Sequence, residues 1–156
     1  MNYFYVEECP TRAAQALCDK HVVKMILETA QMLSTAHRLT ESTQADFVYK
    51  ATHANHPSTK WLRSSQVAYK HGLQHLRALF AEYTHRYGKH HATERLLPHL
   101  SQVPEALPDL PFVEPPQCMY DECRGLDTIA AYRDYYRVRE NEIDMRWTKR
   151  SKPQWL

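Results

Sequence analysis

The spacing of hydrophobic residues predicts two long helices in the first half of the chain. Apolar residues recur every three or four positions over residues 10–37, and Pro10 is suited to the first turn of a helix. A second stretch with the same period runs from residue 57 to residue 87. Gly88 follows it and is expected to end this helix, because glycine readily adopts a left-handed backbone conformation.

Shorter elements are expected in the second half of the chain. A short helix is predicted at 93–97, and Asp127 is placed to cap a helix that reaches about Met145. Residues 98–116 hold six prolines, which predicts a loop across the surface because proline interrupts helices. The N-terminal segment Tyr-Phe-Tyr-Val is expected to be extended or to form a short strand.

These patterns favour an all-α fold, with a compact single domain over residues 1–156, three to five helices and a short extended N-terminus. The chain is 156 residues long, 43% hydrophobic and contains 3 glycines, so it can bury a sizeable core. It has no apolar run long enough to cross a membrane and no secretory signal at its N-terminus. We therefore expect a cytoplasmic protein with no membrane partner, whose four cysteines are thiols.

Basic residues are concentrated at the end of the chain, although the net charge of +2 creates no strong field for nucleic acid. The segment 145–156 contains four basic and no acidic side chains, with Trp147 among them. This composition suits a basic tail in which Lys149 and Arg150 contact a nucleic-acid backbone while Trp147 stacks on a base. It equally suits a tail that its tryptophans dock onto the domain.

A polar stripe runs along the first predicted helix. His21, Lys24, Glu28 and Gln31 are three or four residues apart and therefore share one face, between apolar flanks. Such a stripe is either a solvated face or the wall of a cleft. In a cleft, the carboxylate and the ammonium group can act as acid–base or nucleophilic groups.

The segment Thr-His-Ala-Asn-His-Pro precedes the second predicted helix. His53 and His56 stand beside the helix N-terminus, where backbone N–H groups attract phosphate, and Arg63 follows as a further phosphate or base contact. The alternative is a solvated loop with Asn55 as a capping residue. At the other end of this helix, Arg86 and Lys89 either contact nucleic acid or simply complement the helix dipole.

Metal binding and cofactor binding are not expected. Cys18, His21, Cys118 and Cys123 would supply four zinc ligands, but the second cysteine pair has a loose spacing and no knuckle-like glycine. The chain contains no glycine-rich phosphate loop and no dinucleotide-binding fingerprint.

Three segments together resemble a known family: CDKHVVKMILETAQML, NHPSTKWLRSSQVAY and EYTHRYGK. They are similar to small proteins of tailed phages and bacteria, the pyrimidine dimer DNA glycosylases of the type of endonuclease V of T-even phages. The motif positions are Asp19, His21, Lys24, Glu28 and Gln31 in the first segment, and Asn55, His56 and Pro57 in the second. The resemblance covers residues 1 to about 90, and the proline-rich part looks like the phage branch only.

The resemblance implies a DNA glycosylase and AP lyase in which an N-terminal amine attacks C1′ of the damaged nucleotide. A glutamate on the first helix assists, and Glu28 occupies that position. An α-amino group has a reference pKa near ~8 and is partly neutral at pH 7, as a nucleophile must be. Asn2 is too bulky for routine methionine removal, so the amine would be that of Met1, with Lys24 as a competing amine.

We accordingly predict the catalytic residues Met1, His21, Lys24 and Glu28. The predicted DNA- and phosphate-binding residues are Lys20, His53, Asn55, His56, Arg63, Arg86, Lys89, Trp147, Lys149 and Arg150. DNA is the expected partner, in the cytoplasm of a host cell if the protein is encoded by a phage.

Two other functions fit the same residues. The first is a phage transferase that joins a free amino acid to an activated 5-hydroxymethyluracil in DNA. There Glu28 or His21 would be the base, and Lys24, His53 and His56 would bind the leaving phosphate or pyrophosphate. The second is a non-enzymatic nucleic-acid-binding protein, whose stripe is an interaction face.

Overall fold

The computed structural model describes residues 1–156 and contains helices but no strand, which confirms the all-α fold class. The α-helices are α1 (Pro10–Ala16), α2 (Asp19–Leu39), α3 (Pro57–Leu62), α4 (Gln66–Tyr87), α5 (Leu97–Leu100) and α6 (Thr128–Glu140). Short 3-10 helices are η1 (Ala45–Phe47), η2 (Ala92–Leu96) and η3 (Asp121–Cys123). The first residues form no strand, and they are not extended throughout, because Phe4 has a φ of 41° and its carbonyl accepts a 2.8 Å hydrogen bond from the Val6 N–H.

The first predicted helix is broken into α1 and α2, because the backbone is extended at Leu17 and Cys18. The Cys18 N–H donates to the Tyr136 hydroxyl at 2.8 Å, and the Asp19 N–H donates to the Arg146 carbonyl at 2.8 Å. In a continuous helix both amides would bond within the helix. Here they bond to residues near the end of the chain, which a local sequence pattern does not reveal.

The second predicted helix is also broken, into α3 and α4. Ser65 begins α4 as its N-cap, with its hydroxyl accepting a 3.0 Å hydrogen bond from the Ala68 N–H. Gly72 lets α4 approach α3 closely, since a Cβ atom there would lie 2.6 Å from Leu62 Cδ1. The two breaks raise the number of α-helices to six, compared with the three to five expected.

The predicted helix ends are confirmed at two positions and shifted at two others. Gly88 ends α4 with φ 67°, and Asp127 caps α6 by accepting a 2.9 Å hydrogen bond from the Ala130 N–H. However, α6 ends at Glu140 rather than Met145, because the following residues form tight turns. The short helix predicted at 93–97 is the 3-10 helix η2 followed by α5.

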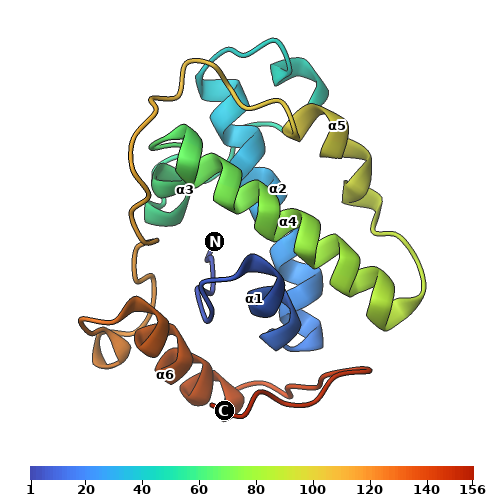
Figure 1. Ribbon diagram of the computed structural model, residues 1–156, viewed down its shortest axis with the longest axis vertical. Coiled ribbons are helices and arrows are strands. Elements are labelled where there is room, and N and C mark those ends of the chain that lie inside the picture. The colour runs from blue at the N-terminus through green and yellow to red at the C-terminus, as the bar shows by residue number, and fades with distance from the viewer.

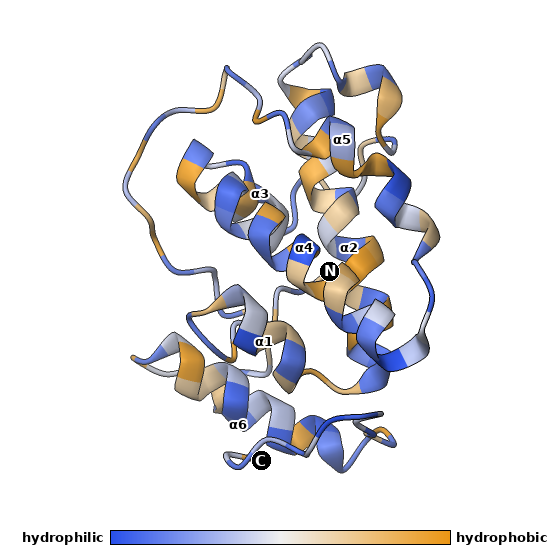
Figure 2. Ribbon diagram, turned by 45° about the vertical axis from the view of Figure 1, so that its right-hand side comes forward, coloured by the Kyte–Doolittle hydropathy of each residue, from blue (hydrophilic) through white to orange (hydrophobic).

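The core lies where α2 and α4 cross, with α1 packed on α4 and α3 packed on α2 (Figure 1). Its 33 buried hydrophobic residues form one cluster that also includes residues of α6. Helices α2 and α4 each carry hydrophobic as well as hydrophilic residues (Figure 2), as expected of helices with one buried face. None of the helices is both long and apolar enough to span a membrane.

The predicted proline-rich loop is an irregular connection that runs from α5 past α3 towards α6 (Figure 1). Backbone carbonyls fix it to the helices. Pro108 accepts a 2.9 Å hydrogen bond from the Gln66 N–H, and Val113 accepts one of 2.7 Å from the Trp61 indole. The connection therefore holds the segment around Cys118 in a defined place, and this segment contributes to the candidate site.

The basic tail at 145–156 is docked on the helices. Trp147 donates from its indole nitrogen to the Ala16 carbonyl at 2.9 Å. The Arg150 guanidinium makes two hydrogen bonds to the buried carboxylate of Glu82, at 3.0 and 2.9 Å. Of the two interpretations of the tail, the structure thus favours the docked one for these side chains.

A buried network of charges lies beneath the tail. Arg86 is fully buried and is paired with Glu82 at 2.7 Å and with Asp19 at 2.9 Å. Burial alone would raise the pKa of Glu82, but hydrogen bonds from Arg150 and Arg86 outweigh it and lower this pKa. Burial likewise opposes the lowered pKa of Asp19, which hydrogen bonds from Thr148 and Arg86 produce. Both carboxylates are therefore held in their charged form.

Candidate active site

Helix α2 presents the polar stripe, but its members have different surroundings. Lys24 is 65% exposed, whereas the side chain of Glu28 is only 13% exposed, and Gln31 is half-buried. His21 is buried, stacked on the Phe4 ring at 4.4 Å. The structure therefore brings Lys24 and Glu28 together and places His21 in the core.

The beginning of the chain meets Glu28. The N-terminal amine of Met1 lies 3.7 Å from Glu28 Oε2, and the Asn2 N–H donates to the same oxygen at 3.0 Å. Lys24 Nζ lies 3.5 Å from the other carboxylate oxygen, Oε1. One half-buried carboxylate is thus surrounded by three nitrogens. Figure 1 shows the N-terminus near the middle of the molecule, between α3 and α6.

The side chain of Asn2 fixes this arrangement. Its amide nitrogen donates to the Cys118 carbonyl at 2.9 Å, and its oxygen accepts a 2.7 Å hydrogen bond from the Tyr3 N–H. Phe4 then adopts a positive φ of 41°, and its ring is buried in the core. A left-handed conformation is unfavourable for a bulky residue, so the surrounding contacts must hold it. The N-terminus is therefore a fixed element of the site.

The loop before α3 adds an imidazole to the site. His56 caps α3 by accepting a 3.2 Å hydrogen bond from the Ser58 N–H at Nδ1, so the proton of its neutral form is on Nε2. Burial lowers the pKa of His56, and the positive charges of the N-terminal amine and His53 lower it further, against the opposing effect of Glu28. The ring is consequently neutral at pH 7 and lies within the field of the amine and of Glu28.

An open cavity of about 800 Å³ lies beside His56. Its walls come from two parts of the chain: His56 and Pro57 at the start of α3, and the segment 116–125 with Tyr135 of α6. The residues that line it are His56, Pro57, Pro116, Gln117, Cys118, Met119, Tyr120, Arg124, Gly125 and Tyr135. A cavity of this size, with aromatic walls and a few polar groups, suits a small organic ligand or one part of a larger one.

The sequence does not reveal that Asn2 is a positioning residue, or that the segment 116–125 and Tyr135 form walls of the candidate site. The density of cysteine and aromatic residues after the last two prolines was a signal, but nothing local connects it with Glu28. The connection arises from the hydrogen bond between Asn2 and the Cys118 carbonyl, across 116 residues of sequence.

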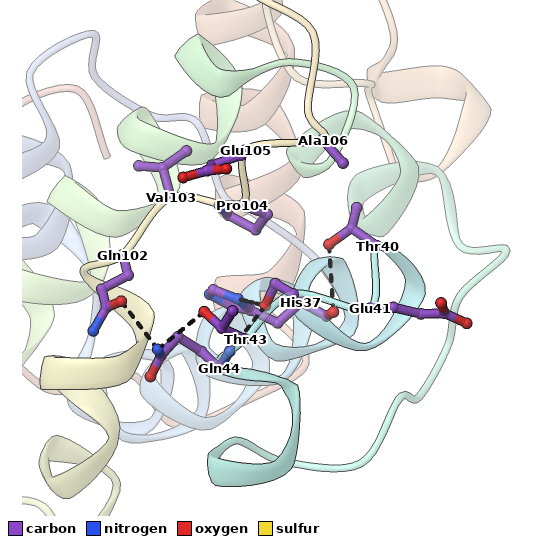
Figure 3. Close-up of a pocket in the computed structure, with 11 residues that line it drawn as sticks. His37, Thr40, Glu41, Thr43, Gln44, Gln102, Val103, Pro104, Glu105 and Ala106 are labelled. Carbon is purple, nitrogen blue, oxygen red and sulfur yellow. Dashed lines mark hydrogen bonds between the residues drawn. The ribbon is translucent and has the colours of Figure 1, made fainter.

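A second cavity, of about 580 Å³, lies at the other end of α2 between residues 40–44 and 102–106 (Figure 3). His37 is its buried histidine, but both ring nitrogens are already used, towards Ser42 at 2.6 Å and Tyr69 at 2.8 Å. Burial lowers the pKa of His37 to about 4, with a smaller contribution from His99. The cavity offers no free acid–base pair, and we do not assign it a catalytic role.

The other predicted DNA-binding residues are distributed over the surface and the core. Lys20, His53, Asn55, Lys89 and Lys149 are exposed, and Arg63 and Trp147 are half-buried. The side chain of Arg86 is fully buried in its ion pairs, and Arg150 is bound to Glu82. The structure therefore leaves Lys20, His53, Asn55, Lys89 and Lys149 accessible. Trp147, Arg86 and Arg150 instead make contacts within the fold.

The four residues considered as zinc ligands do not gather. Cys18 is buried near Tyr136, while Cys118 accepts a hydrogen bond from the Ser58 hydroxyl at 3.3 Å. No group of three or more histidine, cysteine, aspartate or glutamate side chains is arranged to hold a metal ion.

Comparison with known proteins identifies the class of DNA-directed enzymes. The sequence profile of a family described as pyrimidine dimer DNA glycosylase matches residues 1–95, which is more than half of the chain. The chain therefore belongs to the pyrimidine dimer DNA glycosylase family, in agreement with the resemblance of its motifs, and DNA is its class of substrate. No curated protein and no solved structure matches it.

Proposed function

We propose that this protein is a DNA glycosylase and AP lyase that acts on damaged pyrimidines, with the α-amine of Met1 as nucleophile and Glu28 as the acid–base group. The observation that carries this proposal is the distance of 3.7 Å between the amine nitrogen and Glu28 Oε2. Membership of the family supports the reaction class. The fixed position of the N-terminus supports the role of an amine there.

The chemistry requires an amine, a proton carrier and room for a nucleotide. The neutral amine forms a bond to C1′, and the bond between C1′ and the base breaks with its electron pair going to the base. Glu28 takes the proton that the amine loses and gives it to the sugar ring oxygen, whose bond to C1′ breaks with its electron pair going to that oxygen, so that an imine forms at C1′. A general base of the protein then removes a proton from C2′. The 3′ phosphate leaves by elimination, which cuts the strand.

Lys24 competes with Met1 for the role of nucleophile. Its Nζ is as close to Glu28 as the α-amine is, at 3.5 Å, but its side chain is 65% exposed. Lysines become good nucleophiles when burial favours their neutral form, and Lys24 lacks that burial. The half-buried amine of Met1 is therefore favoured.

Asn2 offers a further nitrogen to the same carboxylate. Its backbone nitrogen already lies 3.0 Å from Glu28 Oε2. Removal of Met1 would turn this nitrogen into a terminal amine in contact with Glu28. The site would then keep its geometry with the nucleophile moved by one residue.

His56 complements this pair. Its Nε2–H can donate a hydrogen bond to a phosphate or to the leaving base, because Nδ1 is occupied by the Ser58 N–H. Its neighbours are the N-terminal amine and Glu28, whose charges act on its pKa. We assign it the role of a donor to the DNA at this site.

Borohydride trapping tests the proposal. Duplexes with a thymine dimer, an abasic site or hydroxymethyluracil are incubated with the wild type, with Glu28→Gln, and with Glu105→Gln as an exposed control. We expect a covalent adduct with the wild type and with the control, and its loss in Glu28→Gln. Peptide mapping of the adduct then identifies Met1, Asn2 or Lys24.

Absence of an adduct on every duplex, with DNA binding intact, would contradict the imine mechanism. An increase in base mass on phosphorylated hydroxymethyluracil DNA, after addition of free amino acids, would then indicate the transferase. DNA binding that is unchanged in Glu28→Gln, without either reaction, would indicate a binding protein.

A further inference from the structure

The two residues that follow Asn2 anchor the beginning of the chain in separate parts of the core. The Phe4 ring packs on α2, with its centroid 4.4 Å from that of the His21 ring. The Tyr3 ring packs on α3, with its centroid 4.7 Å from that of Trp61. Tyr3 is only 2% exposed, so its hydroxyl requires a polar partner inside the protein.

The imidazole of His71, on α4, is that partner. The Tyr3 hydroxyl oxygen lies 2.8 Å from His71 Nδ1 and 3.4 Å from the His71 carbonyl oxygen. Burial raises the pKa of Tyr3, so the hydroxyl keeps its proton. Burial lowers the pKa of His71, against a hydrogen bond with the Glu8 backbone that raises it, and the ring is neutral at pH 7. The hydroxyl therefore donates to Nδ1, the nearer acceptor, and Nε2 carries the ring proton.

Polar contacts tie residues 1–5 to distant parts of the chain at three residues. These are Glu28 on α2, Cys118 after the proline-rich loop, and His71 on α4. Glu28 is the proposed acid–base group, and the contact with Cys118 comes from Asn2, next to the amine. The contact with His71 is different, because it reaches the amine only through Tyr3, two residues along the chain.

The position of the amine depends on all of these contacts. The backbone at Phe4 has a φ of 41°, an unfavourable conformation that surrounding contacts must hold. If the hydrogen bond between Tyr3 and His71 is lost, a buried polar group has no partner, and the segment shifts to satisfy it. A shift of about 1 Å in a reacting group can lower a reaction rate by about a hundredfold.

We infer that His71 is a positioning residue for the N-terminal amine, which it holds beside Glu28 through the hydrogen bond from Tyr3. This inference rests on the proposed function, because it concerns how the nucleophile of the same site is placed. It gives α4 a part in catalysis, although no side chain of α4 takes part in the reaction itself.

Tyr3→Phe and His71→Leu each remove the hydrogen bond. With a saturating duplex that contains an abasic site, the rate of borohydride-trapped adduct formation should fall about tenfold in each variant, while the Kd for the duplex stays within about twofold of the wild type. The double variant should lose no more than one single variant, because both substitutions remove the same interaction. Two independent losses that multiply in the double variant would contradict the inference.

His71→Asn separates the hydrogen bond from packing. Asparagine and leucine are similar in size, but only the asparagine amide can bond to the Tyr3 hydroxyl from near the place of Nδ1. We expect adduct formation about fivefold faster with His71→Asn than with His71→Leu, because one hydrogen bond is restored. Equal rates for these two variants would overturn the inference.

Tyr69→Phe is the matched control for lost stability. Tyr69 also lies on α4 and is fully buried, and its hydroxyl oxygen lies 2.8 Å from Nε2 of His37, in the last turn of α2. At a temperature at which all variants are folded, Tyr69→Phe should form adduct at a rate within about twofold of the wild type. A tenfold loss in this variant too would show that the rate follows stability, and the inference would be wrong.

Hydrogen exchange distinguishes a failure of this inference from a failure of the proposed function. Mass spectrometry of the peptide that begins at Met1 follows the N–H groups of Tyr3 and Val6, which donate to Asn2 Oδ1 at 2.7 Å and to the Phe4 carbonyl at 2.8 Å. We expect exchange about tenfold faster in Tyr3→Phe and His71→Leu and unchanged in Tyr69→Phe.

Wild-type exchange in Tyr3→Phe and His71→Leu would overturn the inference, even if their rates of adduct formation fall. If the wild type forms no adduct, the proposed function is wrong. Exchange then still tests whether His71 holds the N-terminus in place.

Discussion

The backbone N–H of Asn2 donates a 3.0 Å hydrogen bond to Glu28 Oε2, which fixes the beginning of the chain to the middle of α2. The same carboxylate lies 3.7 Å from the Met1 amine and 3.5 Å from Lys24 Nζ. Glu28 therefore holds the N-terminus in position and also lies near both candidate amines.

The Asn2 side chain should matter for activity more than for stability. Asn2→Ala removes the hydrogen bonds to the Cys118 carbonyl and from the Tyr3 N–H, so the amine is no longer held in one place. We expect a loss of about 1 kcal/mol in the free energy of unfolding and a fall of tenfold or more in kcat/KM. Chemical denaturation and single-turnover kinetics measure the two effects, with Asn141→Ala as an exposed control. A large loss of stability with unchanged kcat/KM would contradict this role.

The break between α1 and α2 should depend on one hydroxyl. Tyr136→Phe leaves the Cys18 N–H without an acceptor and removes the 2.8 Å hydrogen bond to His21 Nδ1. An unsatisfied buried donor costs about 1–3 kcal/mol, so we expect that loss in the free energy of unfolding. Tyr83→Phe, at a half-buried tyrosine on α4, should cost less than 1 kcal/mol. Thermal and denaturant unfolding of both variants checks this, and equal losses would contradict it.

The buried charges beneath the tail should make stability fall in acid. The pKa values of Asp19 and Glu82 are lowered in the folded state, so their contribution is complete above the pKa of unfolded carboxylates, near ~4, and is lost at lower pH. Glu82→Gln removes the part of this dependence that Glu82 contributes, and it leaves the buried Arg86 with Asp19 as its remaining carboxylate partner. We expect a loss of about 3–5 kcal/mol at pH 7 that becomes smaller as the pH falls below ~4. Denaturant unfolding between pH 7 and pH 3 measures it, and a loss independent of pH would contradict the assignment.

The buried histidines should add a second dependence at higher pH. The pKa of His37 is lowered by burial to about 4 from its ordinary value of 6.5, so the unfolded state binds a proton between these values and the folded state does not. Stability conferred by the neutral ring is therefore complete above pH 6.5 and declines as the pH falls to about 4. His37→Gln should reduce the slope of stability against pH in this window by up to about 1.4 kcal/mol per pH unit. An unchanged slope would show that His37 is protonated in the fold.

Local patterns in the sequence predicted the helices and one half of the site. The helical class, the end of α4 at Gly88 and the cap at Asp127 follow from interactions within a few residues, which a sequence displays directly. Glu28 and Lys24 are one turn apart, so their proximity was also predictable. The same holds for His56, whose place at the start of α3 follows from the proline after it.

Features that depend on distant residues were not predictable in this way. At the first helix break, the Cys18 N–H bonds to the hydroxyl of Tyr136, which is far away in sequence. At the second break, Gly72 allows the close packing of α4 on Leu62 of α3. The burial of Arg86 in an ion-pair network also depends on a distant partner, Asp19. The position of Arg86 in the last turn of a predicted helix is equally typical of an exposed cation. The half of the cavity formed by residues 116–125 comes from a part of the chain with no periodic pattern.

The contacts between Asn2 and Cys118, between Cys18 and Tyr136, and between Asp19 and Arg146 all close loops of more than one hundred residues. Contacts so distant in sequence form slowly, because the chain must order a long loop before they contribute. On the ribosome, the first residues emerge well before those that complete their surroundings. A nascent chain would therefore carry Met1 and Glu28 without the contacts that Cys118, Tyr136 and Arg146 supply, and the candidate site would take shape only after these residues have been synthesised.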